Sequence, residues 1–480
     1  MLWLQTLLSS PRRLAMLFLL CALPTGLGCA LLAPVGMFPD EFAHAARADA
    51  LRHGEIFGVK PPPSFPHFMI DQGVMIDGGI FGVMFSKEFI HAFPDKPVRQ
   101  EDRLLLRQIP WFPGLQYFPT QMVEYFPLLY SPAALAILGA QAVGVMPVYA
   151  YYAGRVGMLL AFLAAGAAAI GLARTGNGLI FAVLTLPTTV NLASSYNQDG
   201  LLIASFALAA ALLTRRDKSW GVALALMLAG ICAKTPYVAL LGFCLPPLAA
   251  TGLPRRLVMV LLACVAVALW LLHCIHTGFI PYQRPPYAPG PLWHGPAGTM
   301  LTHVDPYANL RVLLAHPWQM PWLPLHTLLL NWHISWTRLL GMVSCDTVLI
   351  WPWEYPLLAA SFLAALCGSL VSRPVAGWRA GDAGFAALAL FGAFTGMELS
   401  MYLTFTRVGL GWIEGVQPRY YLPLLPFLVF LLPWAGRFLR LGALPHPIPG
   451  WFTLPACAMA LVNAIALPLY IHHLFQMPGP

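Results

Sequence analysis

Residues 14–36 read LAMLFLLCALPTGLGCALLAPVG and contain no charged side chain. This stretch is long enough for a helix that crosses a hydrocarbon core of ~30 Å, which takes ~20 apolar residues. Arg12 and Arg13 precede it, and basic residues in short flanking segments stay in the cytoplasm. Because the apolar region runs on to Pro34 without a small-x-small cleavage site, we expect an uncleaved first span rather than a secretory signal. The N-terminus is then cytoplasmic, and Asp40 lies on the outer face.

The rest of the chain has the same apolar character. Of its 480 residues, 59% are hydrophobic and only 10% are charged, whereas soluble chains carry about 25% charged residues. The apolar stretches are continuous rather than alternating, which favours helices over strands. The formal net charge is +8, but the basic residues are spread between apolar stretches, so no nucleic-acid partner is expected. The nine cysteines form no C-x-x-C pair, which indicates neither a disulfide framework nor a zinc site.

The basic loops predict the topology. Placing them in the cytoplasm gives about eleven membrane-spanning helices and an external C-terminus. The stretch at 128–146 fits this scheme only as a juxtamembrane helix on the outer surface. We expect an all-α integral membrane bundle with one transmembrane domain over residues 1–480. Its external loops, 37–149 and 279–346, should fold with short helices. The expected spans are 14–36, 150–173, 178–195, 199–214, 219–234, 236–250, 255–278, 347–372, 383–406, 418–436 and 451–472.

A polar motif follows the first span directly. Pro39 suits a helix start, and Asp40, His44 and Arg47 then fall on one helix face at spacings of four and three. A carboxylate, an imidazole and a guanidinium at the membrane boundary can bind and deprotonate a polar substrate. In the structural alternative, Asp40 caps the helix and Arg47 pairs locally.

Four further polar clusters lie in apolar surroundings, and the expected topology places all of them at outer ends of spans. Ionisable groups beside spans are costly and indicate function, although helix caps and snorkelling side chains are the structural alternative. Lys234 fits that alternative poorly, because the inside-positive bias would place a structural lysine on the other face. Acidic and basic groups in one external cavity suit transfer from a phosphate-linked donor. The clusters are Ser194 to Asp199, Lys234 to Tyr237, Asp346 with Thr347, and Glu414, Gln417, Arg419, Tyr420 and Tyr421.

Three motifs carry a resemblance to a known family. They are Pro39-Asp40-Glu41-x-x-His44-x-x-Arg47-Ala48, Lys234-x-Pro236-Tyr237 and Gly415-Val416-Gln417-x-Arg419-Tyr420. The chain resembles a bacterial family of multi-span membrane proteins that is similar to the GT-C glycosyltransferases. The stretch Tyr125 to Tyr130, followed by Gly154-Arg155-Val156, also resembles the GT-C pattern of a surface helix leading to an arginine at the second span. Pro418 stands where the family pattern has Gly, and Pro suits the first turn of a helix.

The resemblance implies an inverting glycosyltransferase in the bacterial inner membrane. It would transfer a sugar from a polyprenyl-phosphate donor to a cell-envelope glycan or lipid acceptor on the external leaflet. The resemblance makes Asp40 the base, with Glu41 second. The residues expected at the donor phosphate are Lys234, Arg419, Arg47, Arg155, Tyr237 and Tyr420, and those expected at the sugar or acceptor are His44, Tyr196, Asp199, Asp346 and Gln417.

Metal dependence stays open. No metal ligand is assigned, because Lys and Arg alone can neutralise a monophosphate leaving group. Should a cation be required, Asp40, Glu41 and His44 would favour Mg²⁺, Mn²⁺ or Ca²⁺, since most of their ligand atoms are oxygen.

Three other functions also fit parts of the pattern. A transporter or flippase of lipid-linked sugars would need the same cations, but its site should lie near the bilayer midplane. A polymerase or ligase of lipid-linked glycans would share the chemistry and handle a whole oligosaccharide. A non-enzymatic partner in envelope assembly would not explain so many ionisable groups in apolar surroundings.

Overall fold

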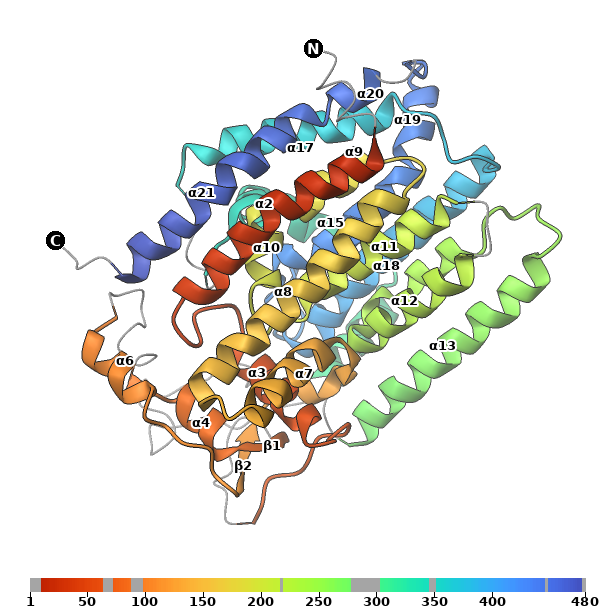
Figure 1. The fold of residues 1–480 in the computed structure, drawn as a ribbon. Helices are drawn as coiled ribbons and strands as arrows, with labels where there is room; N and C mark the ends of the chain where they lie inside the picture. The colour runs from red at the N-terminus through yellow and green to blue at the C-terminus, as the bar shows by residue number, and fades with distance from the viewer. Residues whose placement is uncertain are drawn as a thin grey trace.

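The computed structural model describes residues 10–63, 72–87, 98–215, 219–277, 303–344, 351–444 and 448–476. Long helices lie side by side in a bundle, and short elements gather at the end where α3, α4 and the two strands lie (Figure 1). Five helices in the described chain are long and apolar enough to cross a membrane. They are α2 (Pro11–Leu32), α8 (Pro147–Leu172), α13 (Leu253–His276), α18 (Ala380–Thr404) and α21 (Leu454–Gln476).

A sixth span arises if two consecutive helices count as one. The 3₁₀ helix η4 (Pro418–Phe430) and α19 (Leu432–Phe438) are bent by 55° and together pass the same criteria. The described chain therefore contains five to six candidate spans, and the expectation of about eleven is wrong. The membrane-spanning character itself is confirmed.

The difference lies in helix length rather than in the position of the apolar segments. α11 (Asp199–Leu213), α12 (Trp220–Ala233) and α17 (Glu354–Leu370) coincide with expected spans but have at most 17 residues. At 1.5 Å per residue, such helices rise no more than ~26 Å, less than the ~30 Å core. The expected span 236–250 is the 3₁₀ helix η3 (Thr235–Cys244) followed by turns.

Proline breaks another of the expected spans. The segment 178–195 forms two helices, α9 (Asn177–Leu184) and α10 (Pro187–Ala193), with a bend between them. Pro187 opens the second helix, and the residue before a proline is disfavoured in helical conformation.

α11 lies at the centre of the bundle. Nearly every one of its residues is buried, as expected for a helix that is apolar all round. It packs against α8, α12 and η4, while α8 in turn packs against α2 and the surface helix α7 (Ser131–Ala142). The first residue of this buried helix is Asp199, so the bundle core carries a carboxylate to one of its ends.

The segment between α2 and α8 folds against that end of the bundle. It contains a two-stranded antiparallel sheet in which β1 (Gly73–Asp77) pairs with β2 (Leu115–Pro119), with Gly73 opposite Pro119. The fold is therefore mostly helical rather than all-α. The other elements here are α3 (Glu41–Arg52), α4 (Gly78–Met84), α6 (Gln100–Leu106), η1 (Gln121–Glu124) and η2 (Pro127–Tyr130).

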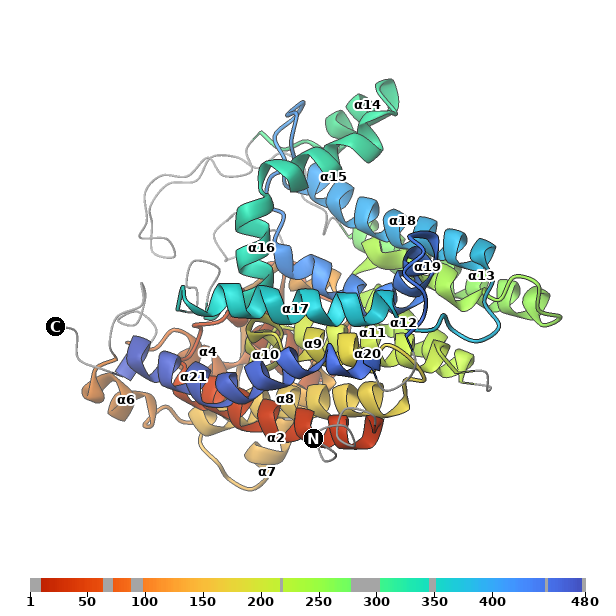
Figure 2. The same cartoon turned by 90° about the horizontal axis from the view of Figure 1, so that it is seen from above.

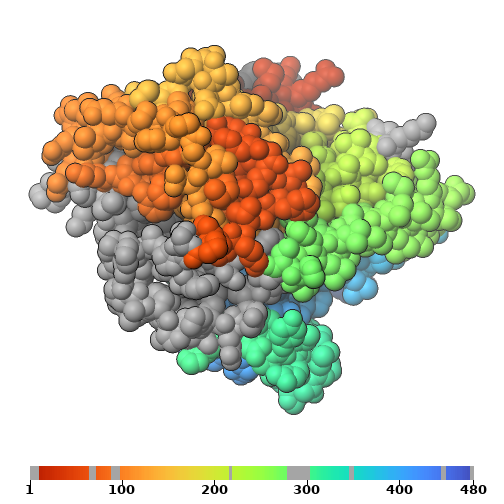
Figure 3. Space-filling view, turned by 90° about the horizontal axis from the view of Figure 1, so that it is seen from below, coloured from red at the N-terminus to blue at the C-terminus, as the bar shows by residue number. Residues whose placement is uncertain are grey.

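Two short helices, α14 (Pro306–Ala315) and α15 (Gln319–Leu330), lie beside α18, and a view from above shows them projecting from the bundle (Figure 2). The next helix, α16 (Trp332–Gly341), packs against η4, α10 and α17. Seen from below, the segments between α2 and α8 form a continuous surface beside α13, with α14 and α15 lying further out (Figure 3). The last short helix, α20 (Ile448–Trp451), precedes α21.

Tight packing between α8 and the α10–α11 turn gives the first prediction. A Cβ atom at Gly154 would lie 2.0 Å from the hydroxyl oxygen of Tyr196, a fully buried side chain. Gly154→Ala should therefore lower the free energy of unfolding by roughly 1–3 kcal/mol and lower the thermal unfolding midpoint in detergent. Gly139→Ala is the control, because nothing lies within 4 Å of a Cβ atom there. Equal midpoints for both variants would contradict this packing.

Candidate active site

Asp40 lies between the end of α2 and the start of α3. Its backbone is left-handed, with φ 54° and ψ 21°, and its side chain makes no capping hydrogen bond to α3. A non-glycine residue in this conformation is uncommon, although Asp is among those that tolerate it. The surrounding loop is held in place, since Asn197 Nδ2 donates to the Pro39 carbonyl at 3.2 Å and Ser344 Oγ donates to the Met37 carbonyl at 2.7 Å. The carboxylate is thus directed away from the helix terminus that it was expected to cap in the structural alternative.

The Asp40 carboxylate begins a chain of four alternating charges. Asp40 Oδ2 lies 2.6 Å from Arg419 Nη2. Arg419 Nε lies 3.4 Å from Asp199 Oδ2, and Asp199 Oδ1 lies 2.5 Å from Lys234 Nζ. Each group comes from the end of a different element: the loop before α3, the first turn of η4, the start of α11 and the end of α12. The tertiary structure thus joins the motif beside the first span to three of the four later clusters.

The four charges differ in their access to solvent. The side chains of Arg419 and Asp199 are each 3% exposed and that of Lys234 is 11% exposed, whereas that of Asp40 is 47% exposed. Buried charges are tolerated when they are paired, which accounts for the inner three. Asp40 is the member of the chain that an incoming molecule can reach.

Electrostatics keep the Asp40 carboxyl ionised. Partial desolvation by the surrounding protein raises its pKa, but the positive charge of Arg419 and weaker contributions from nearby basic groups outweigh this effect, so the pKa lies below its ordinary value. An opposite charge within a few ångströms favours the charged form of a carboxyl group. At neutral pH this carboxylate is therefore ready to accept a hydrogen bond or a proton.

His44 lies one turn after Asp40 on α3 and faces the interior. It is 3% exposed, and its Nδ1 atom lies 2.6 Å from the Tyr130 hydroxyl oxygen. Its ring also stacks on that of Tyr125, with 6.3 Å between centroids. Burial, helped by the nearby cations, lowers the pKa of His44 to about 4, although the carboxylates oppose the shift. His44 is therefore neutral at pH 7 and serves as a hydrogen-bonding group.

Two expected donor-binding arginines have other partners. Arg155, on α8, donates to Glu41 from two of its side-chain nitrogens, Nε to Oε1 at 2.7 Å and Nη2 to Oε2 at 2.8 Å. Its remaining donors bind carbonyl oxygens at the end of α2, and both side chains are fully buried. Arg47 is also fully buried and donates to the carbonyls of Ile56 and Tyr125. The side chains of Glu41, Arg47 and Arg155 are thus held by partners within the protein, and the arrangement does not bring them to the exposed Asp40 carboxylate.

The tyrosines that sequence analysis selected fall into two groups. Tyr196 is fully buried and donates to the Tyr151 carbonyl at 2.7 Å, away from the charge chain. Tyr237 donates to the Tyr420 carbonyl at 2.6 Å and so joins η3 to η4. The Tyr420 ring lies under Lys234, with Nζ 4.3 Å from the centroid, a cation–π contact.

Gln417 and Gln198 carry polar groups that the fold leaves unused. Gln417 Oε1 is buried and has no hydrogen-bond partner in the described part of the chain. The same holds for both side-chain amide atoms of Gln198, which is fully buried beside Asp199. In the sequence, Gln198 stands in the cluster Ser194 to Asp199 and has no predicted role of its own. Asp346 lies outside the described residues.

An apolar cavity adjoins the charge chain. It measures about 180 Å³, and Lys234, Tyr420 and Tyr125 line it together with Leu271 of α13 and Met397 of α18. Lys234 thus lies at the edge of a space whose other walls are largely apolar. Within the described ranges, no three His, Cys, Asp or Glu side chains gather closely enough to hold a metal ion.

Together, the bundle and this cluster define a helical membrane protein with several spans and a buried charge chain at one end. The chain belongs to the DUF2142 family, described as "Predicted membrane protein (DUF2142)", whose profile matches residues 17–428. Membership in a multi-span membrane protein family is therefore confirmed, while the similarity to GT-C glycosyltransferases stays a prediction. No curated protein matches the chain.

The buried His44 should make stability depend on pH. Its pKa in the folded protein, about 4, lies below the ordinary 6.5, so the unfolded chain binds more protons between these values. The stability that neutral His44 contributes is present above the ordinary pKa and is lost as the pH falls toward 4. The thermal unfolding midpoint should therefore fall less between about pH 7 and pH 4.5 in His44→Gln than in the wild type. His333→Gln, at an exposed histidine, should match the wild type; equal slopes for all three proteins would refute the assignment.

Proposed function

We propose that this protein is an inverting glycosyltransferase that uses a polyprenyl-phosphate sugar donor and a glycan or lipid acceptor. The observation that supports this most is the solvent-accessible Asp40 carboxylate, which pairs with Arg419 at one end of a charge chain whose other end, Lys234, lines a largely apolar cavity. Such a donor has three parts: a sugar to be attacked, a phosphate that leaves and an apolar tail. The described site offers a matching group for each part.

In the proposed reaction, Asp40 accepts the proton of the acceptor hydroxyl. The acceptor oxygen forms a bond to the anomeric carbon as the bond between that carbon and the phosphate oxygen breaks. The phosphate leaves with the electron pair, and Arg419 and Lys234 neutralise its charge. A single displacement inverts the configuration at the anomeric carbon.

Donor binding would also raise the basicity of Asp40. Arg419 holds Asp40 in an ion pair at 2.6 Å, which lowers the pKa of the carboxyl and makes it a weaker base. A phosphate that shares the guanidinium would weaken this pair, and the pKa of Asp40 would rise toward the neutral range where a general base works best. The arrangement thus couples arrival of the donor to activation of Asp40.

The apolar cavity would take only the part of the prenyl chain next to the phosphate. Its volume is about 180 Å³, whereas pockets that enclose a whole ligand measure roughly 300–1,000 Å³. The remainder of the chain would then lie in the bilayer. We place the protein in a bacterial inner membrane with the N-terminus in the cytoplasm, which puts this site on the external side.

The first functional test concerns the base. Asp40→Asn keeps the shape of the side chain but cannot accept the proton, so donor turnover should fall by ~10²–10⁴-fold. The measurement is consumption of a panel of polyprenyl-phosphate sugars by protein in nanodiscs, with candidate acceptors and with divalent cations varied. Glu101→Gln, at an exposed carboxylate of α6, is the control and should retain activity.

The outcomes separate the alternatives. Turnover by Asp40→Asn at the wild-type rate would refute Asp40 as the base. If wild-type protein consumes no donor under any condition but moves a labelled lipid-linked sugar across proteoliposomes, the transporter function replaces the transferase. Transfer of whole oligosaccharides but no single sugars would indicate a polymerase or ligase.

The second test separates the charge of Lys234 from its structural role. Lys234→Gln alone would weaken the pairing of buried Asp199, which destabilises by several kcal/mol. The double variant Lys234→Gln/Asp199→Asn removes both charges and keeps a hydrogen-bonding pair, so its unfolding midpoint should stay close to that of the wild type. Its kcat/KM for the donor should still fall by at least ~10-fold, because a cation at the leaving phosphate is lost. Wild-type kcat/KM in this double variant would exclude Lys234 from donor binding.

A further inference from the structure

Glu398 is a carboxyl group within α18, one of the five candidate spans. Its side chain is fully buried. Oε1 accepts a hydrogen bond from the Tyr421 hydroxyl, whereas Oε2 has no hydrogen-bond partner in the described part of the chain. None of the ion pairs among the described residues includes Glu398. An ionisable group within a span is costly and indicates function.

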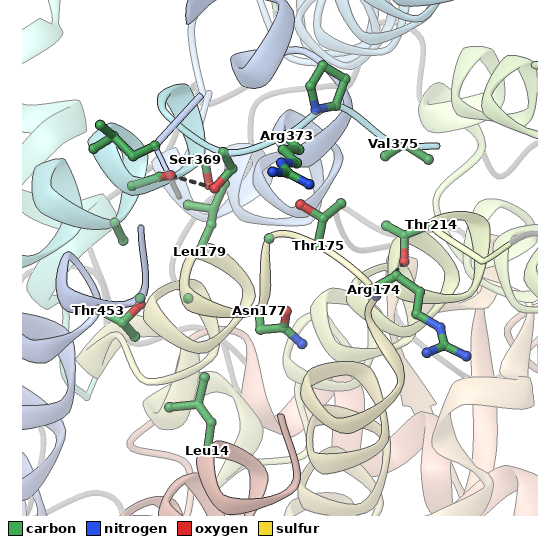
Figure 4. A pocket seen from close by; sticks show the side chains of 18 of the residues that line it. Leu14, Arg174, Thr175, Asn177, Leu179, Thr214, Ser369, Arg373, Val375 and Thr453 are labelled. Carbon is green, nitrogen blue, oxygen red and sulfur yellow. Dashed lines mark hydrogen bonds between the residues drawn. The ribbon is translucent and has the colours of Figure 1, made fainter. Parts of the chain in front are cut away.

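Glu398 lies toward the end of the bundle that holds the charge chain. The opposite end contains a cavity of about 940 Å³, lined by Leu14 in the first turn of α2 and by Arg373 in the segment before α18 (Figure 4). Glu398 comes 18 residues after the first residue of α18, which places it ~27 Å along the helix axis. Its neighbour Met397 lines the apolar cavity of the candidate active site. The buried carboxyl group is therefore close to that site.

α18 also supports η3, the 3₁₀ helix that follows Lys234. A Cβ atom at Gly396 would lie 2.8 Å from the Pro236 carbonyl oxygen. One at Gly392 would lie 3.2 Å from Ala239 Cβ. Two glycines four residues apart lie on one helix face and allow two backbones to approach closely. This packing fixes η3 on α18 and, with it, Lys234 at the N-terminal end of η3.

η4 contacts α18 through Tyr421. The Tyr421 ring lies 5.8 Å from the Phe394 ring, measured between centroids, and its hydroxyl donates to Glu398. The two preceding residues have partners in the candidate active site. Arg419 belongs to the charge chain, and the Tyr420 ring forms the cation–π contact of the site. Because a 3₁₀ helix has three residues per turn, these three residues form one turn, and a shift of Tyr421 would displace the other two.

We propose that Glu398 is a positioning residue that sets the first turn of η4 on α18 through Tyr421 and thereby fixes the spacing of Arg419 and Lys234. α18 holds η3 by close packing of the backbones, but it holds the first turn of η4 by this hydrogen bond. Glu398→Leu would suit the apolar surroundings and leave the Tyr421 hydroxyl without its acceptor. The placement of η4 does not depend on the reaction. The consequence for a donor phosphate, which both cations would share, rests on the proposed function.

The placement of η4 is tested without substrate, by hydrogen–deuterium exchange of the protein in nanodiscs. Glu398→Leu removes the acceptor, so the backbone amides of Arg419, Tyr420 and Tyr421 should exchange at least about fivefold faster, the effect of losing one hydrogen bond. Glu398→Gln keeps an acceptor oxygen and should restore the wild-type rate. Glu354→Leu, the control, removes a similarly buried carboxyl group from α17 and should leave these amides unchanged.

A second variant keeps the test decisive if Glu398→Leu fails to fold. Glu398→Leu/Tyr421→Phe replaces both partners by apolar groups, which can be nearly neutral for stability. This double variant should show the same faster exchange. Wild-type exchange in the double variant would overturn the proposal, and so would exchange in Glu398→Gln as fast as in Glu398→Leu.

The consequence for the donor is measured as a split between KM and kcat. The double variant should raise the KM for a polyprenyl-phosphate sugar at least about fivefold, because Arg419 and Lys234 no longer meet the same phosphate. A purely structural defect would lower the amount of active protein and hence the apparent kcat, with KM unchanged. An unchanged KM would therefore exclude Glu398 from donor binding. Absence of any turnover by the wild type would count against the transferase function, and the exchange rates would still decide the placement of η4.

Discussion

The Arg155 guanidinium is the contact on which the geometry of the candidate active site depends. All five of its N–H donors are used, by the two oxygens of Glu41 and by the carbonyls of Ala30, Ala33 and Pro34. The last carbonyls of a helix lack hydrogen-bond partners within it, and a carbonyl without a partner is costly in an apolar bundle. One side chain on α8 thus satisfies the end of α2, fixes the first turn of α3 and determines where the loop between them lies.

That loop in turn completes a second set of paired charges. Asp40, Arg419, Asp199 and Lys234 alternate in sign, so the three buried members are compensated and the outermost is held at the surface. A buried ion pair is weak evidence for stability, because desolvation offsets much of the attraction. Here the ion pairs fix positions rather than add stability, because the ends of four elements must meet before the buried charges are compensated. A substrate phosphate that binds among these four charges would change ion pairs that are already formed.

The short and irregular helices serve the same arrangement. η3 and η4 are 3₁₀ helices with a proline in the first turn, Pro236 and Pro418, each within two residues of a cation of the charge chain. Irregular backbone at membrane depth is tolerated where neighbouring protein surrounds it, and η4 packs against α11 and α18. The apolar composition predicted helices at these segments correctly. It overestimated the number of full spans, because hydropathy reports where a segment lies and not whether its helix continues unbroken for ~20 residues.

The sequence by itself determined that the chain is a multi-span membrane protein and which motifs carry its ionisable groups, because apolar length and the cost of charge in an apolar medium are local properties. Only the tertiary structure decided how those groups pair. Asp40 and Glu41 are adjacent, but Asp40 has a left-handed backbone in the loop before α3, whereas Glu41 is the first residue of the helix. Asp40 meets Arg419 while Glu41 meets Arg155. Choosing between such partners requires the three-dimensional positions of segments up to 379 residues apart, which a pattern of residue types does not contain.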